Sequence, residues 1–215
     1  MTEICFASHN PAKLARYRAL VAPLGCALRS LGDLGVTTKI DEPYATSMEN
    51  AWHKAHAYAK LVHLPVLAVD EELSTNFLPE HLQPGVLVRR LGRQLEHDPS
   101  DREVLAHWLE LIQNHPHPDQ RFTWTFSIAF WDQVSWVEGS VQVRQENEVA
   151  TRVSRQIRPG YPMSSFLSPA GTGRLPWAET PPELVSRAER ENFAPFIAAF
   201  GRWLGELREA RRAEH

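Results

Sequence analysis

The chain has 215 residues, of which 43% are hydrophobic and 23% are charged, and its formal net charge is −3. This composition is typical of a globular protein with a sizeable core and excludes a disordered chain. The slight acidic excess argues against a general nucleic-acid binder, whose surface is usually basic. Two cysteines, Cys5 and Cys26, are too few for a disulfide scaffold.

The first third of the chain alternates short apolar runs with helical patterns. In chain order these segments are a strand at 4–7, a helix at 11–21, a strand at 28–31, a helix at 47–62 and a strand at 65–69 that ends at Asp70. Asn10 with Pro11 fits an N-cap, and Thr46 with Glu49 fits a capping box. This order predicts an α/β sheet, in which ligands bind beyond the carboxyl ends of the strands.

The rest of the chain carries weaker patterns. We expect a helix at 102–113, paired strands at 122–131 and 136–144, a loop at 160–182 and closing helices at 182–212. Aromatic residues of the paired strands should pack in the core, namely Trp124, Phe126, Phe130, Trp131 and Trp136. We expect a single domain of two lobes over residues 1–205 and a charged tail at 206–215.

The N-terminus does not suggest export, and no segment suggests a membrane span. The N-terminus has no basic segment followed by an apolar one, which a secretory signal would have. No run of about 18 apolar residues exists, so no membrane span is expected. We therefore expect a cytoplasmic protein.

The loop after the first strand combines the features of an anion site. Ser8, Asn10 and Lys13 lie at the start of a helix, where free amides and the positive end of the helix dipole face a ligand. A lysine this early in a helix opposes the dipole, and a bound phosphate would compensate for it. Plain helix capping with a solvated lysine is the alternative explanation.

Three charged residues further along suggest metal-assisted phosphate chemistry. Glu49 begins the second helix and Asp70 ends the buried strand, and Mg²⁺ binds a few carboxylates together with phosphates and water. Lys54 on the same helix either reaches a phosphate or is solvated. Glu49 could serve the capping box alone, and Asp70 could be a loop acid. His53 and His56 lack a third ligand, which favours a surface or core role over a metal pair.

Four segments, in one unbroken order, resemble the motifs of the inosine triphosphate pyrophosphatase family. The family's Thr/Ser-x-Asn-x-x-Lys, Phe-x-Glu-Asn-Ala-x-x-Lys-Ala, Leu-Pro-x-Leu-Ala-Asp-Asp-Ser-Gly-Leu and Pro-Gly-Val-Tyr-Ser-Ala-Arg-Tyr correspond to residues 8–13, 48–55, 64–73 and 84–91. An arginine-phenylalanine strand, a Glu-Gly turn and part of a glycine-rich loop also match, at 121–122, 138–139 and 166–179. The similarity covers roughly residues 3–195.

The resemblance implies an elongated mixed β-sheet with flanking helices and two lobes with a nucleotide cleft between them. It implies a homodimer that uses Mg²⁺ to cleave a nucleoside triphosphate between its α- and β-phosphates. The usual substrates carry 6-keto purines, such as ITP, dITP and XTP. Glu49 and Asp70 would hold Mg²⁺, and Asp70 would also orient or deprotonate the attacking water. The phosphate-binding residues would be Ser8, Asn10, Lys13 and Lys54.

Several family positions are changed in this chain. In the third motif, the first aspartate of the paired acids is Val69 and the Ser-Gly after the pair is Glu71-Glu72. The serine of the fourth motif is Val88, and the aspartate of a Gly-Tyr-Asp-Pro loop is absent from 160–166. In the family a lysine and a Ser-His-Arg trio close over the base, and these positions fall on Val185 and 189–191. Phe166, Arg187 and Arg190 remain as candidates for base recognition. An arginine can donate two hydrogen bonds to a 6-keto purine, although both arginines could equally be solvated on a helix face.

Three functions fit these observations. The protein is an active pyrophosphatase with a shifted base preference, or a catalytically degenerate sensor of a dITP-like nucleotide, or a descendant without a ligand. The sensor would signal to an effector protein in a hetero-complex, for example in antiphage defence. The retained Asn10, Lys13, Glu49 and Asp70 speak against the third function. Neither nucleic acid nor a membrane is expected as a partner.

Overall fold

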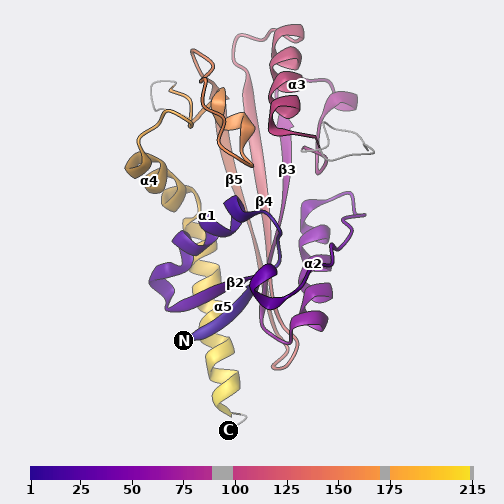
Figure 1. The fold of residues 1–215 in the computed structure, drawn as a ribbon, viewed down its shortest axis with the longest axis vertical. Helices are drawn as coiled ribbons and strands as arrows, with labels where there is room; N and C mark the ends of the chain where they lie inside the picture. Colours follow the sequence, from indigo (N-terminus) through magenta and orange to yellow (C-terminus); the bar gives the residue numbers. More distant parts are fainter. Residues whose placement is uncertain (89–98, 170–174, 214–215) are drawn as a thin grey trace. The chain divides into compact units, whose positions relative to one another are not determined.

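A mixed β-sheet organises the computed structural model, which describes residues 1–88, 99–169 and 175–213 (Figure 1). Its strands are β1 (Thr2–Phe6), β2 (Cys26–Ser30), β3 (Val66–Thr75), β4 (Arg121–Asp132), β5 (Val137–Val149) and β6 (Leu167–Pro169). They follow the order β2-β1-β3-β4-β5-β6. β1 pairs in parallel with β2 and β3, whereas β5 pairs antiparallel with β6. The predicted mixed α/β fold is thus confirmed.

Helices and short turns connect these strands. The α-helices of the described residues are α1 (Pro11–Val21), α2 (Ser47–Val62), α3 (Asp101–Asn114), α4 (Pro182–Asn192) and α5 (Ala194–Ala213). The 3-10 turns are η1 (Ala22–Leu24), η2 (Gly32–Leu34), η3 (Glu80–Leu82) and η4 (Pro162–Ser165). The chain divides into two compact units. The first comprises Met1–Glu71, Phe126–Val143 and Phe193–His215, and the second comprises Glu72–Thr125 and Arg144–Asn192.

The first unit has a packed core on each face of its strands, because successive side chains of a strand point to opposite faces. On one face, Tyr58 of α2 packs in a cluster that includes Cys5 of β1. On the other face, the ring of Phe6 lies 5.3 Å from Tyr17 of α1, and Tyr17 lies 5.3 Å from Phe196 of α5. Figure 1 shows α2 on one side of these strands and α1 with α5 on the other. β1 therefore lies between α2 on one face and α1 with α5 on the other, and α1 begins shortly after β1 ends.

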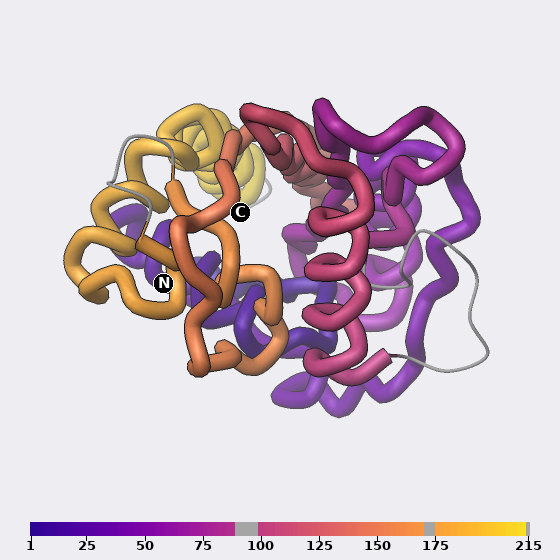
Figure 2. The backbone as a smooth tube through the Cα atoms, turned by 90° about the horizontal axis from the view of Figure 1, so that it is seen from above, coloured from indigo at the N-terminus to yellow at the C-terminus, as the bar shows by residue number. Residues whose placement is uncertain are grey.

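The second unit has its own aromatic core. Trp108 of α3 lies 5.4 Å from Phe122 of β4, and Phe166 lies 5.8 Å from the same ring. A capping box between Ser100 and Glu103 begins α3. Figure 2 shows α3 beside the orange segment that contains η4, and these two elements are in contact.

β3 is longer than the sequence indicated. It was expected to end at Asp70 but continues through Thr75, past two acidic residues that disfavour a strand. Backbone pairing holds the extension, since Leu73 and Gly85 exchange two hydrogen bonds of 2.9 and 3.1 Å. Asp70 therefore lies within a strand, beyond Leu67, which is the last residue of β3 that pairs with β1.

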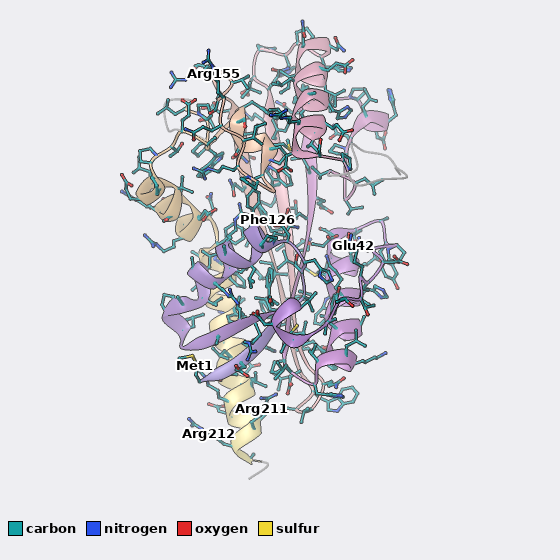
Figure 3. The ribbon with its side chains drawn as sticks, viewed as in Figure 1. Met1, Glu42, Phe126, Arg155, Arg211 and Arg212 are labelled. Atoms are coloured by element: carbon teal, nitrogen blue, oxygen red, sulfur yellow. The ribbon has the colours of Figure 1, made fainter. Side chains whose placement is uncertain are left out.

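One of two further expectations, on the closing helices and on Trp136, is corrected. The closing helices expected to residue 212 end at Ala213, and the charged tail from residue 206 is part of α5, where Leu207 is fully buried and Arg211 donates to Asp132 at 3.0 Å (Figure 3 labels Arg211). Trp136, expected in the core, is 77% exposed in the turn before β5, with a φ of 53°. None of the described helices has the length and hydropathy to cross a membrane.

Candidate functional site

The start of α1 is closed by its own N-cap. Asn10 Oδ1 accepts from the amides of Ala12 at 2.9 Å and Lys13 at 3.3 Å. The Leu14 amide donates to the Asn10 carbonyl at 3.1 Å, and the Ser8 hydroxyl accepts from the Asn10 amide at 3.2 Å. The free amides expected here are therefore engaged. An anion would instead meet the helix dipole and the side chains of Asn10 and Lys13.

Lys13 reaches across to β3. Its Nζ lies 3.1 Å from Oε1 of Glu71, and the two side chains are only 19% and 13% exposed. The register of the parallel strands explains this contact. Phe6 of β1 pairs with Leu67 of β3, so the loop and helix after Phe6 lie beside the residues that follow Leu67.

Lys54 of α2 is the most heavily bonded charge of the site. Its Nζ donates to Glu42 Oε1 at 2.7 Å, to the Val69 carbonyl at 2.7 Å and to Asp70 Oδ1 at 3.0 Å. The lysine is buried, so an unpaired ammonium here would carry a large desolvation cost. Val69, which replaces a family aspartate, contributes its carbonyl while its side chain is buried.

Asp70 is a buried carboxyl between charges of both signs. It is 7% exposed, and this burial raises its pKa above the usual value. The Lys54 ammonium lowers the pKa of Asp70, the Glu42 carboxylate raises it, and Lys13 lowers it. A carboxylate with a raised pKa is a better proton acceptor than an ordinary aspartate. The sequence-predicted Lys13, Lys54 and Asp70 thus form one electrostatic cluster.

Glu49 does not join this cluster. Its carboxylate accepts from the Thr46 hydroxyl at 2.6 Å, and its amide donates to the same hydroxyl at 3.3 Å. The hydroxyl–carboxylate bond takes the place of the amide–carboxylate bond of the predicted capping box. Among the residues that the structure describes, no ion pair or hydrogen bond joins Glu49 to Asp70 or Lys54.

Glu42, which the sequence analysis missed, takes the position beside Asp70. It lies in the loop before α2 (Figure 3), and two contacts with α2 hold that loop. The Asn50 side chain exchanges bonds of 3.0 and 3.1 Å with the backbone of Tyr44. The Tyr58 hydroxyl donates to the Thr38 carbonyl at 3.1 Å. An acid shortly before a helix start was the only local signal for Glu42, and such acids are common.

The base-recognition candidates belong to the second unit. Phe166 is 1% exposed and packs in the aromatic core. Arg187 is exposed on α4, where its Nε donates to Glu191 at 2.8 Å, and Arg190 is exposed as well. The predicted family positions at 89–91 and 170–174 lie outside the described residues.

The two histidines of α2 make aromatic contacts. The ring of His53 lies 5.4 Å from Tyr44, edge-on, and His56 stacks on Trp52 at 5.4 Å. His56 also lies 4.9 Å from Trp131 of β4. Both histidines therefore pack against aromatic rings of the first unit.

The fold and the cluster together define a mixed α/β protein with paired lysines and carboxylates beyond the carboxyl end of β1. Residues 4–158 match the model of the Ham1 family, and the chain belongs to that family. This confirms the resemblance carried by the four motifs.

Curated relatives and solved structures agree with this membership. The chain is 32% identical over 143 residues to a dITP/XTP pyrophosphatase of Bacillus subtilis, covering 66% of this chain and 71% of the relative. It is 36% identical over 115 residues to a dITP/XTP pyrophosphatase of Ralstonia nicotianae, covering 54% of this chain and 56% of the relative, so this second match spans about half of each protein.

Among solved structures, a HAM1 protein of Coxiella burnetii has a TM-score of 0.72 at 24% identity, over 96% of this chain and 100% of that one. A structure titled nucleoside-triphosphatase and dITP/XTP pyrophosphatase, from Mycobacterium abscessus, has a TM-score of 0.64 at 25% identity, over 92% and 97%. The similarity in structure therefore extends well beyond the segments that align in sequence.

Proposed function

We propose that this protein is a Mg²⁺-dependent nucleoside triphosphate pyrophosphatase that acts on purine nucleotides such as ITP, dITP and XTP. The observation that carries the proposal is the buried Asp70 carboxyl, bonded to Lys54 and accompanied by Glu42. The names of the Bacillus and Ralstonia relatives supply the substrate class. The enzyme would cleave the bond between the α- and β-phosphates and release pyrophosphate.

The carboxylates fit a magnesium ion that is shared with the substrate. Within the described ranges, no three of His, Cys, Asp and Glu converge as a complete metal centre. A substrate-bound Mg²⁺ does not need one, because it takes one or two carboxylates and completes its shell with phosphate oxygens and water. Glu42 and Asp70, which bind the same ammonium, offer these oxygens. We therefore propose Glu42 as a further ligand of the ion, beside the motif residues Glu49 and Asp70.

The chain's own residues account for binding and proton transfer. When bound, the ion would neutralise charge on the phosphates and polarise their phosphorus–oxygen bonds. Lys13 would bind a phosphate oxygen, and the Asn10 amide group would donate to another. Lys54 would support the phosphate site by holding Glu42 and Asp70, since its three N–H donors already bind these carboxylates and the Val69 carbonyl. Asp70 would accept a proton from a water whose oxygen attacks the α-phosphorus. The bond to the bridging oxygen breaks, and pyrophosphate leaves with the electron pair, which leaves the monophosphate.

Base selectivity and assembly are part of the same proposal. The positions that give the family its donors to a 6-keto oxygen are occupied by Val185 and residues 189–191. We therefore propose weaker discrimination between purine bases than in ordinary family members, since each lost donor removes a few kcal/mol at most. We also propose a homodimer and a cytoplasmic location, which the family resemblance implies.

A second candidate function is nucleotide sensing without turnover. The observation that favours it is Val69, which leaves Asp70 as the remaining acid of the family's pair. Such a protein would bind a dITP-like nucleotide and signal to an effector protein in a hetero-complex, for example in antiphage defence.

One experiment separates these functions. The protein is incubated with Mg²⁺ and with ITP, dITP, XTP, ATP or dATP, and calorimetric binding and pyrophosphate release are measured in parallel. A pyrophosphatase binds and releases pyrophosphate, and it binds ITP at least about tenfold more tightly than IMP, since the charged contacts to two phosphates are lost. Binding without release favours the sensor. Equal affinity for IMP and ITP contradicts both functions.

A further inference from the structure

Glu71 differs from the family motif and places a charged side chain inside the cluster. The family motif has a serine after its paired aspartates, where this chain has Glu71. Oε1 of Glu71 lies 3.1 Å from Lys13 Nζ, and the glutamate side chain is 13% exposed. The contact is an ion pair without hydrogen-bond geometry, because that buried oxygen accepts no hydrogen bond in the described part of the chain. The Glu71 carboxylate is therefore held to Lys13 by charge alone.

A carboxylate in this position competes with a phosphate in two ways. Carboxylate and phosphate oxygens bind an ammonium with the same geometry, at nitrogen–oxygen distances of about 2.7–2.9 Å for good pairs. The Glu71 carboxylate therefore occupies space beside the Lys13 ammonium that a phosphate oxygen would use. Its negative charge also repels an incoming polyphosphate, and the side chains are shielded enough from water for that repulsion to be felt.

The net charge of the whole cluster also disfavours a free polyphosphate. Glu42, Asp70 and Glu71 face Lys13 and Lys54, which leaves an excess of negative charge before any ligand binds. A serine at position 71 would remove that excess and leave Lys13 without its carboxylate partner. A free polyphosphate should therefore bind more weakly to this cluster than a polyphosphate that is complexed with a divalent cation.

We propose that Glu71 is an internal competitor for the phosphate-binding Lys13, and that it restricts the site to polyphosphates complexed with a divalent cation. The inference rests on the proposed function for the role of Lys13. It adds a charged residue that sets affinity and charge selectivity, in a position where the family motif has an uncharged serine. The alternative is that Glu71 only ties α1 to β3.

The test compares Glu71→Gln and Glu71→Ser with wild type. The matched control is Glu72→Gln, which removes the same charge from the next residue, on the opposite face of β3. The probe is inorganic tripolyphosphate, which has no base, titrated by calorimetry at low ionic strength with Mg²⁺ or with a chelator. We expect both Glu71 variants to bind roughly three- to tenfold more tightly, and the gain to be larger with the chelator. Glu72→Gln should stay within about twofold of wild type.

A second measurement reports the reactivity of the Lys13 amine directly. An amine-reactive acylating reagent is applied to the ligand-free protein, and its attachment is mapped by mass spectrometry. Lys13 should react several times faster in Glu71→Gln, and the exposed Lys60 of α2 serves as the internal reference. Thermal unfolding of each variant shows that it is folded, and Glu71→Ser provides a second variant if Glu71→Gln is not.

The outcomes are distinguishable. Unchanged or weaker tripolyphosphate binding in both Glu71 variants overturns the inference, as does an equal gain in Glu72→Gln. Unchanged labelling of Lys13 overturns it as well. If the variants behave as expected but no nucleotide is hydrolysed, the pyrophosphatase activity is refuted and the competition by Glu71 stands.

Discussion

Replacing Lys54 by methionine should destabilise the protein more than any other single change in the cluster. The substitution removes an ammonium that lies 2.7 Å from Glu42, 2.7 Å from the Val69 carbonyl and 3.0 Å from Asp70. Lys54 and Asp70 are both buried, so water cannot replace the lost donor. Breaking a buried ion pair costs about 3–5 kcal/mol, because the remaining charge stays uncompensated.

Asp70 can recover part of this loss by taking up a proton, since burial already raises its pKa. We therefore expect the lower end of the range, about 3 kcal/mol of unfolding free energy at pH 7. Asp70→Asn should cost less, about 1–2 kcal/mol, because Lys54 keeps Glu42 and the Val69 carbonyl. The double variant should be no less stable than Lys54→Met alone, because the uncompensated carboxylate is gone.

Urea denaturation at pH 7 measures these differences. Lys60→Met is the matched control, since Lys60 is exposed on the same helix and should change stability by no more than about 0.5 kcal/mol. The reasoning is refuted if Lys54→Met lies within about 1 kcal/mol of wild type. It is also refuted if the two single losses add in the double variant, because that would show that Lys54 and Asp70 do not interact.

The remaining predictions concern catalysis, base selectivity and the buried thiol. Asp70→Asn should abolish pyrophosphate release while leaving the circular dichroism spectrum unchanged; activity within a few-fold of wild type would mean that another group handles the water. Arg187→Ala and Arg190→Ala should leave the ratio of ITP to ATP affinity within about twofold, since both side chains are exposed; a selective loss of ITP binding would identify an arginine as the base reader. Burial raises the pKa of Cys5 to about 12, so in a Cys26→Ala variant the thiol should react with Ellman's reagent at pH 8 at least about a hundredfold more slowly when folded than in urea. Comparable rates would show that Cys5 is reached without unfolding.

Local structure in this chain was largely predictable. Asn10 and Pro11 begin α1, and Thr46 begins α2, as the capping patterns indicated. Residues 66–69 form a buried strand, as their apolar run indicated. These features depend on neighbours in sequence, which a reader of the sequence can see. The length of β3 was not predictable, because its second half is held by a partner at Gly85.

The candidate site was predictable only in part. The motifs pointed to Lys13, Lys54 and Asp70, and the structure brings these three charges into one cluster. The same motifs pointed to Glu49, whose carboxylate accepts from the Thr46 hydroxyl, and its role at the site stays a prediction. A glutamate in the first turn of a helix fits the pattern of a helix cap and the pattern of a metal ligand equally well, so the sequence could not decide between these two roles.

The sequence by itself determined the family, the mixed α/β fold and the residue types that can bind phosphate. Only the tertiary structure decided which charges meet. Glu42 reaches Lys54 because Asn50 and Tyr58 hold the loop before α2. Lys13 meets Glu71 because the parallel register of β1 and β3 sets their ends side by side. Such pairings join residues far apart in the chain, and they depend on strand register and loop anchoring, which no local pattern encodes.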